Sequence, residues 1–444
     1  MIASSGPTMH DPARKLRIRL DGELTAYLDA CVRCGLCARS CHYYLADGEL
    51  ESIPGFKLNR LGGLYRRVVR FRDRGLGGAD LEARLGGELL SAMADMAYGR
   101  CTMCGRCAFH CSIGLDVSKV THRLRGILGE LGGVPEGLQS AILAARETGN
   151  NMRITRDEWV DTVKWLEEDL RDEVSDDSVS MPLDREGARI LYAVNPREPK
   201  FFPLSLSAAG KVFHAAAEDW TMSSRFFDVT NYAYFAGDDS EAAKFAGNLV
   251  SEAERLGVEI LVLSECGHGY YAARWHVPEY SERKSRVQVL SILELLWDYI
   301  RTGRIRVSRS KNTARTTLHD PCHLVRKGGI IEEQRNILKS VVTDFVEMTP
   351  NREGNFCCSG GGGSLSMTSF AERRMNSGRS KAEQIKRTRA GVVAAPCHNC
   401  INQLLELDRH YELGVRVLTV TELVADALLL PAEGTWTEKR LRNA

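Results

Sequence analysis

The sequence predicts an α+β protein in which a helical, cysteine-rich domain precedes a tandem repeat of two α/β domains. Three observations lead to this prediction. Eight of the fourteen cysteines form two runs of identical spacing in the amino-terminal part of the chain. From residue 188 onward, short apolar strands alternate with helices, a pattern typical of a mostly parallel sheet. Within that second part, two stretches repeat each other's pattern.

The bulk composition allows several domains and gives no sign of a nucleic-acid partner. The 444 residues exceed the roughly 150 residues of an average domain. A net charge of +1 gives no reason to expect nucleic acid. The first thirty residues lack an apolar signal segment, and no run is long enough to span a membrane. We therefore expect a cytoplasmic protein, in which cysteines bind metal or do redox work rather than form disulfides.

The chain divides into six predicted segments. They are a polar arm (1–22), a domain with both cysteine runs (23–133), a helical linker (134–187), a first α/β repeat (188–312), a second α/β repeat (313–430) and a tail (431–444). Apolar periodicity predicts helices at 58–72, 79–98, 240–256, 286–301, 329–347 and 369–388, with further helices within 134–180. Strands are predicted at 190–194, 260–263 and 392–395, and the repeat adds a strand near 316–318.

The two amino-terminal runs have the spacing C-x2-C-x2-C-x3-C, which is typical of [4Fe–4S] clusters. Three thiolates of such a run reach one cube, and the fourth ligand comes from the other run. The first cube is assigned to Cys31, Cys34, Cys37 and Cys111, and the second to Cys101, Cys104, Cys107 and Cys41. Zinc is the alternative, but two matching four-cysteine runs do not fit the usual zinc motifs. His42 and Ser112 stand where a proline usually follows the fourth cysteine.

A second constellation lies in the second α/β repeat. It supplies five thiolates from three loops, namely Cys322, Cys357, Cys358, Cys397 and Cys400. A simple cube needs four ligands, and the side chains of an adjacent pair diverge, so the pattern favours a larger or more open cluster. The glycines at 360–363 would let the backbone approach it closely. The alternative is a buried vicinal pair beside a zinc or structural C-x2-C site.

The internal repeat relates this constellation to the first α/β half. Strand 189–194 with Asn195-Pro196 parallels 316–322, and residues 261–268 parallel 393–400. The second copy has five cysteines and the first has one, Cys266. Ligands of open α/β sheets bind at the carboxyl ends of the strands, where these cysteines fall.

These motifs resemble the CCG-domain iron–sulfur proteins, in particular the D subunit of heterodisulfide reductase and the DsrK-type subunit. The resemblance rests on A-C-V-R-C-G-L-C at 30–37, S-C-H-Y-Y at 40–44, C-T-M-C-G-R-C at 101–107 and the tandem repeats. It implies a ferredoxin-like domain with two [4Fe–4S] cubane clusters, followed by a degenerate and a complete CCG repeat. It also implies one noncubane [4Fe–4S] cluster on the five later cysteines. Ser359 replaces the glycine of the family motif.

Cys266 and three histidines are further candidates near that cluster. By the pseudo-symmetry of the repeat, Cys266 should face the same cleft as Cys397, as an extra ligand or as a thiol that traps substrate. A buried cysteine that packs as a small hydrophobe is an equal alternative. His268, His323 and His398 each lie next to a cysteine of this region, where they could donate protons or only support the structure.

The resemblance implies a heterodisulfide reductase-like oxidoreductase acting on sulfur compounds. Electrons would pass through two cubanes to the noncubane cluster and reduce, or form, a disulfide or trisulfide. The implied partners are a cytochrome b-type integral membrane subunit of a quinol-linked complex and a small cysteine-containing sulfur carrier or thiol substrate. The protein would then lie at the inner face of the cytoplasmic membrane. The alternatives are a relay subunit of a flavin-dependent 2-hydroxyacid or glycerol-3-phosphate dehydrogenase, and a scaffold with structural clusters.

Overall fold

The computed structural model describes residues 22–73, 87–280 and 285–430, and these form two compact units. The first unit contains the described residues up to 139 together with 233–239 and 359–380. The second unit contains 140–232, 240–358 and the described residues from 381. The stretch 359–380, which directly follows the adjacent cysteine pair, thus groups with the amino-terminal unit.

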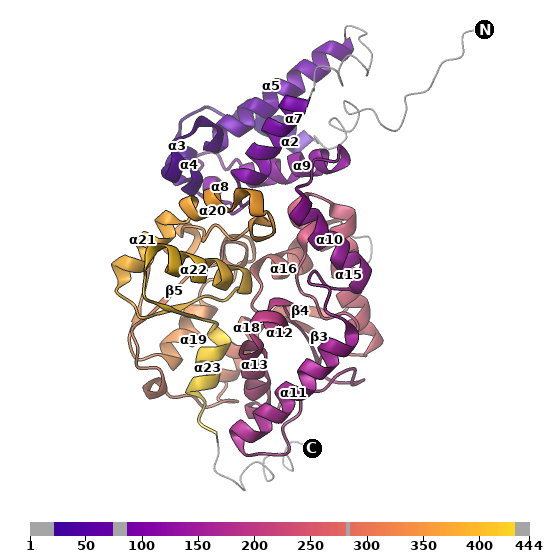
Figure 1. The fold of residues 1–444 in the computed structure, drawn as a ribbon, viewed down its shortest axis with the longest axis vertical. Coiled ribbons are helices and arrows are strands. Elements are labelled where there is room, and N and C mark those ends of the chain that lie inside the picture. The colour runs from indigo at the N-terminus through magenta and orange to yellow at the C-terminus, as the bar shows by residue number, and fades with distance from the viewer. Residues whose placement is uncertain (1–21, 74–86, 281–284, 431–444) are drawn as a thin grey trace, which may run out of the picture. The chain divides into compact units, whose positions relative to one another are not determined.

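The first unit is helical, as the sequence predicts. Its helices are α2 (Gly22–Ala30), α3 (Leu36–Ser40), α4 (His42–Asp47), α5 (Pro54–Asp73), α7 (Gly87–Ala94), α8 (Arg106–Phe109), α9 (Val117–Glu130) and α20 (Ala371–Ser377), with the π-helical turn η2 (Asp95–Gly99). Figure 1 draws most of them in indigo and purple. The helix predicted at 58–72 lies inside α5. Part of the helix predicted at 79–98 falls outside the described residues, and the rest forms α7 and η2.

Arg125 of α9 ties the separate stretches of this unit together. Its side chain is fully buried and lies over the ring of Tyr98, with 4.6 Å between the guanidinium carbon and the ring centroid. The guanidinium donates to the carbonyl oxygens of Cys101 and Gly362 at 2.7 Å each. It also donates to the carbonyl oxygens of Phe235, at 2.7 Å, and Ala97. Because a buried cation must be fully hydrogen-bonded, this residue holds the three segments to the second cysteine run.

The second unit contains two four-stranded parallel sheets of the same topology. The strands are β1 (Ile190–Ala193), β2 (Trp220–Thr221), β3 (Ile260–Leu263), β4 (Gln288–Ser291), β5 (Thr316–Leu318), β6 (Phe345–Val346), β7 (Val392–Ala394) and β8 (Arg416–Leu418). Their orders are β2-β1-β3-β4 and β6-β5-β7-β8, and every pairing is parallel. The predicted repeat and the predicted α/β class are confirmed. The sequence-based prediction missed the outer strands β2, β4, β6 and β8.

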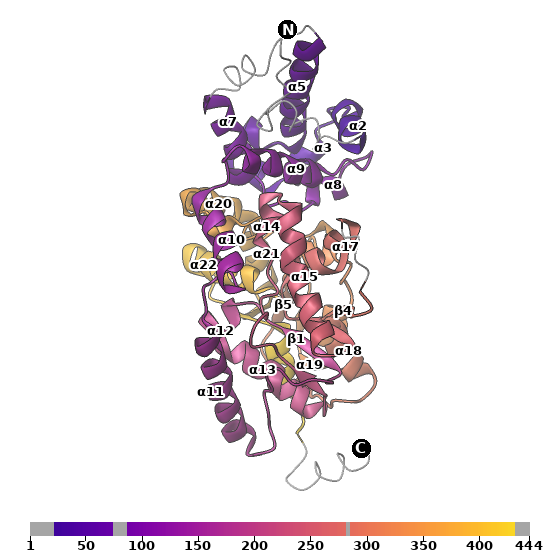
Figure 2. The ribbon, with the colours of Figure 1, turned by 90° about the vertical axis from the view of Figure 1, so that its right-hand side faces the viewer.

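Helices surround both sheets, as Figures 1 and 2 show. They are α10 (Glu136–Thr148), α11 (Arg156–Val174), α12 (Arg197–Phe201), α13 (Pro203–Ala215), α14 (Tyr232–Ala236), α15 (Asp239–Arg255), α16 (Gly267–Tyr271), α17 (Val277–Tyr280), α18 (Ile292–Arg301), α19 (Glu333–Val341), α21 (Arg379–Thr388), α22 (His398–Tyr411) and α23 (Val420–Ala427). α10 and α14 each have residues in both units. The inner strands are almost completely buried.

Three predicted helices need correction. The helix predicted at 286–301 begins only at Ile292, because Ser291 and Glu294 form a capping box there and the preceding residues make β4. The helix predicted at 329–347 is confined to α19 and is followed by β6. The helix predicted at 369–388 is split at Gly378 into α20 and α21. Periodicity alone does not locate such breaks, because one cap or one glycine decides them.

Candidate functional site

The two ferredoxin-type runs adopt the same backbone conformation. In the first run, Arg33 and Gly35 flank the second cysteine with φ values of 56° and 80°; in the second run, Met103 and Gly105 do so with 55° and 75°. Left-handed residues of this kind turn successive N–H groups into one concavity, which suits an anionic cluster. A left-handed arginine or methionine is uncommon, so its recurrence at matching positions indicates a shared function.

The thiols of the first run line a cavity of about 250 Å³ together with two cysteines of the second run. Its cysteine lining consists of Cys31, Cys34, Cys37, Cys107 and Cys111. Around this run the side chains of Val32 and Leu36 are 67% and 44% exposed. A cavity of this size with five cysteines in its lining fits a bound iron–sulfur cube.

The second run is less exposed than the first. Thr102 and Met103 are at most 1% exposed. Burial, with smaller contributions from the nearby thiols of Cys104 and Cys101, raises the pKa of Cys41 to about 11 against the opposing charge of Lys57. Cys41, from the first run, thus lies among the thiols of the second. This arrangement is compatible with the predicted exchange of the fourth cysteine between the two runs.

In the second unit the chemistry-bearing loops follow two neighbouring strands, β5 and β7. The chain leaves β5 into His319–Cys322 and leaves β7 into Ala395–Cys400. β6 lies on the far side of β5, and β8 on the far side of β7, so the strand order reverses between β5 and β7. Ligands of open parallel sheets bind at such a switch point.

Three of the five predicted thiols meet at this edge. The Cys400 thiol lies within hydrogen-bonding reach of Cys358 and Cys397, and these contacts and burial raise its pKa. The same contact with Cys400 lowers the pKa of Cys397 to about 7. All five side chains of the constellation are at most 6% exposed. A dry cluster of soft sulfur donors fits an iron–sulfur group.

The first α/β half contributes to the same edge. Burial, and then the charge of Cys397, raise the pKa of Cys266, and the Gly267 N–H donates to the Cys397 sulfur, so Cys266 lies beside this site. A Cβ added to Gly267 would lie 3.0 Å from the backbone nitrogen of Leu324, so the two halves are in close contact there. Cys266 is 1% exposed, and its sulfur lies 3.4 Å from Nδ1 of His268.

The three histidines named from the sequence are buried in this region. Nδ1 of His323 lies 3.4 Å from the Cys322 sulfur. Nδ1 of His398 lies 3.2 Å from the carbonyl oxygen of Glu265. Burial lowers the pKa of His398 to about 4 and that of His268 to about 3. Both imidazoles are therefore neutral at neutral pH.

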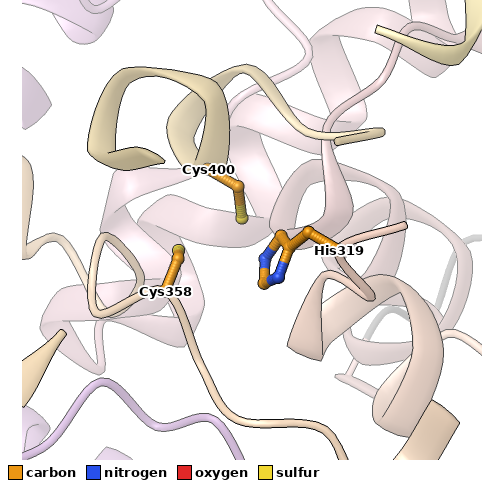
Figure 3. Close-up of side chains that lie close together, drawn as sticks. All are labelled: His319, Cys358 and Cys400. Atoms are coloured by element: carbon orange, nitrogen blue, oxygen red, sulfur yellow. The ribbon is translucent and has the colours of Figure 1, made fainter. Parts of the chain in front are cut away.

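Two buried polar residues at the site escaped the sequence analysis. The first, His319, directly follows β5, and neither ring nitrogen has a hydrogen-bond partner among the described residues. Figure 3 shows its ring beside Cys358 and Cys400. Burial, and to a smaller extent the nearby charge of Lys381, lower its pKa far below the usual value. The signal that could have found His319 was its place as the first polar residue after an apolar strand end, three positions before Cys322.

Lys381 is the second such residue. It is fully buried and donates to Oδ1 of Asn355 at 2.6 Å. Burial lowers its pKa to about 7, against the opposing effects of Asp320 and the thiols of Cys358 and Cys357. Its side chain therefore places a positive charge beside the sulfur cluster whenever it is protonated. No sequence signal marks it, since α21 contains several other basic and polar residues.

A buried ion pair holds the loop that connects β5 to Cys322. Both oxygens of Asp320 accept from Arg335 at 2.8 Å, and Arg335 also donates to Glu347 at 2.8 Å. The backbone N–H of Arg352 donates to Asp320 at 2.7 Å. The side chains of Asp320 and Arg335 are at most 1% exposed. This bidentate pairing fixes the backbone between His319 and Cys322.

Comparisons with known proteins match both cysteine-rich regions of the chain to iron–sulfur families. A 4Fe-4S dicluster domain matches residues 27–115, and a cysteine-rich domain of the CCG type matches residues 316–405. The chain is 25% identical to an Hdr-like menaquinol oxidoreductase iron-sulfur subunit 2 of Archaeoglobus fulgidus, over 93% of this chain and 82% of that one. It is 26% identical to the D subunit of the dihydromethanophenazine:CoB–CoM heterodisulfide reductase of Methanosarcina barkeri, over 90% of this chain and 94% of that one.

A further relative has a different name. The chain is 23% identical to an EtfAB:quinone oxidoreductase of Syntrophomonas wolfei, over 76% of this chain and 48% of that one.

Within the described ranges, no helix of the chain has the length and apolar character of a membrane span. The chain is therefore an iron–sulfur electron-transfer protein with a 4Fe-4S dicluster domain and a CCG domain, and it resembles the D subunit of heterodisulfide reductase along most of its length.

Proposed function

We propose that the chain is a heterodisulfide reductase-like protein that accepts electrons at its amino-terminal runs and reduces, or forms, a disulfide or trisulfide at the five-cysteine site. The observation that carries this proposal is the meeting of Cys358, Cys397 and Cys400 at the switch point of the second sheet, with Cys266 beside them. A purely structural site needs four thiolates, and additional buried thiols suit redox chemistry on sulfur.

The proposed cofactors are two cubane clusters and one noncubane cluster. The proposed ligands are Cys31, Cys34, Cys37 and Cys111 for the first cubane, Cys101, Cys104, Cys107 and Cys41 for the second, and Cys322, Cys357, Cys358, Cys397 and Cys400 for the noncubane cluster. The cavity along the first run and the grouping of Cys41 with the second run support this assignment. When bound, such clusters supply one-electron transfer, and two such transfers with two protons convert a disulfide into two thiols.

The contrast between the two runs supports a direction of electron flow. Cys34 of the first run is exposed, whereas Thr102 and Met103 of the second run are buried. A Cβ added to Gly362 would lie 2.7 Å from Cα of Thr102, so this glycine lets the backbone pack directly on the second run. Gly362 is only four residues beyond Cys358 in the chain. The first run would receive electrons, and the second would pass them toward the five-cysteine site.

The proposed partners follow from the names of the relatives and from the surface of the first run. Relatives named as menaquinol oxidoreductase and heterodisulfide reductase subunits support a hetero-oligomer. We propose a cytochrome b-type membrane subunit, which would hold the protein at the inner face of the membrane, and a small cysteine-containing sulfur carrier or thiol as substrate. The exposed apolar side chains of Val32 and Leu36 offer a docking surface for an electron donor.

Thiol-dependent EPR tests the proposal. The full chain, reconstituted anaerobically, is oxidised with and without a thiol. We expect a paramagnetic signal that requires thiol, disappears in Cys358→Ala and persists in the matched variant Cys34→Ala, which alters a cubane ligand instead. Wild-type protein with full iron content and no thiol-dependent signal contradicts disulfide chemistry.

A relay subunit of a flavin-dependent dehydrogenase is the second candidate. The similarity to the EtfAB:quinone oxidoreductase favours it, because the match to that relative covers three quarters of this chain. A relay transfers electrons without binding substrate at its last cluster. In the EPR experiment it would show reduction of all clusters by a partner and no thiol-dependent signal.

A further inference from the structure

We infer that His319 is a nitrogen ligand of the iron–sulfur cluster at the five-cysteine site, in addition to the cysteine thiolates. The inference rests on the proposed function only in so far as these cysteines hold such a cluster. It deepens the proposal, because a neutral nitrogen ligand changes the charge and the potential of the group that would meet the substrate.

The first argument is the unsatisfied imidazole. The side chain of His319 is fully buried, and both Nδ1 and Nε2 lack a hydrogen-bond partner among the described residues. A buried polar atom without a hydrogen-bond partner destabilises the fold, so the large majority of such atoms have partners. A ligand bound among the neighbouring thiols would satisfy the ring.

The second argument is the distance to those thiols. One ring nitrogen of His319 and the sulfurs of Cys358 and Cys400 all lie within 4.8 Å of one another. Ligands of one tetrahedral metal, bound at about 2.1 Å for nitrogen and about 2.3 Å for sulfur, lie about 3.6 to 3.8 Å apart, roughly 1 Å closer than this limit. The three side chains come from the end of β5, from the loop that holds Cys358 and from the first turn of α22, and they face one space (Figure 3). They therefore form a ligand set that needs only small adjustments.

The third argument is the rigidity of the loop. The His319 N–H donates to the carbonyl oxygen of Ala394 at 2.9 Å, which extends the ladder between β5 and β7 by one residue. The next residue, Asp320, is held by Arg335. The ring is thus presented from a fixed backbone, as ligands of metal sites usually are.

The fourth argument comes from the first α/β half. Ala193 pairs with Leu263 in that sheet as Leu318 pairs with Ala394 in the second, so Val194 occupies the position of His319. Val194 is fully buried. The fold therefore accepts an apolar side chain at this position, and histidine occurs in the half that has the five cysteines.

The experiment is pulsed EPR on the reconstituted full chain, with ring-¹⁵N histidine as the isotope probe. We expect a nitrogen coupling typical of an iron-bound imidazole that changes with the isotope. It should disappear in His319→Gln and persist in His323→Gln, the matched variant of the histidine beside Cys322. A coupling of the weak kind that a hydrogen-bonded ring gives, or one unchanged in His319→Gln, overturns the inference.

Two further measurements distinguish failure of the His319 inference from misfolding of the variant and from failure of the proposed function. If His319→Gln does not fold, the coupling in His323→Gln decides, because that variant keeps His319 and removes the histidine beside Cys322. His319→Cys should keep the iron and lower the cluster potential, because a thiolate replaces a neutral nitrogen. Zinc in place of iron at Cys358 and Cys400 would instead contradict the proposed function.

Discussion

The two α/β halves of the second unit share one sheet topology but differ at the carboxyl ends of their strands. Where the second half has His319, Asp320 and Cys322, the first half has Val194, Asn195 and Arg197. Arg197 does not face an empty site: it donates to the side-chain oxygens of Asn399 and Asn402 at 3.1 Å each. The first half thus uses as a structural contact the position that the second half uses for a thiol.

This difference teaches that the fold does not require the third cluster. The first half has apolar inner strands, and Cys266 is its only cysteine. The second half places a buried ion pair and a buried lysine around its five cysteines. The following variants test whether these charged groups affect the stability and the cluster potential of the second half more than comparable groups affect other parts of the molecule.

The largest effect is expected for Arg335→Met. It would leave the buried Asp320 carboxylate without its bidentate partner and lower the free energy of unfolding of the second half by about 3–5 kcal/mol. Anaerobic thermal unfolding and amide exchange at β5 measure this loss. The matched variant Arg189→Met in the first half should cost about 1 kcal/mol or less, because Glu218 keeps Arg304 and Tyr299 as partners. Equal losses of stability in the two variants would contradict the expected difference between the two halves.

A pH-dependent effect is expected in the first half from Asp228. Burial raises the pKa of its carboxyl group to about 7, from about 3.9 in the unfolded chain. The folded state therefore holds this proton more tightly, and the stability it contributes is complete below about pH 4 and is lost as the pH rises through 7. The stability lost over this pH range is at most about 4 kcal/mol, and it is smaller if the fold relaxes around the ionised carboxylate.

Asp228→Asn should abolish this loss, as measured by amide exchange at β1 and β3 between about pH 5 and pH 8. Asp176→Asn is the control, because the stability contribution of Asp176 should depend on pH in the opposite direction. Hydrogen bonds with Ser178 lower the pKa of Asp176, so its small contribution to stability is lost as the pH falls. An unchanged pH profile in Asp228→Asn would refute the prediction.

A smaller effect is expected for Lys381→Met. Removing a cation beside the five cysteines should make the potential of the third cluster more negative, on the order of 60 mV, or about 1.4 kcal/mol. Potentiometric EPR titration measures it. Lys57→Met is the matched variant, since Lys57 is a buried lysine near Cys41 and should shift a cubane instead. An unchanged potential of the third cluster in Lys381→Met would contradict the prediction.

The sequence by itself determined the class of chemistry and the order of the domains. The spacing within each cysteine run is local, and so is the alternation of strands and helices, because both depend on residues close together in the chain. The repeat indicated that Cys266 and Cys397 belong to one region, and the structure brings them together.

Only the tertiary structure decided what surrounds the sulfur atoms. His319 and Lys381 are separated by 62 positions along the chain (381 − 319), and their own neighbourhoods in the sequence do not connect them. Their importance arises from burial beside Cys358 and Cys400, which depends on the packing of β5, β7 and α21. Burial is a property of the whole fold, and it is burial that makes an unpaired imidazole or a lone ammonium group costly enough to require a partner.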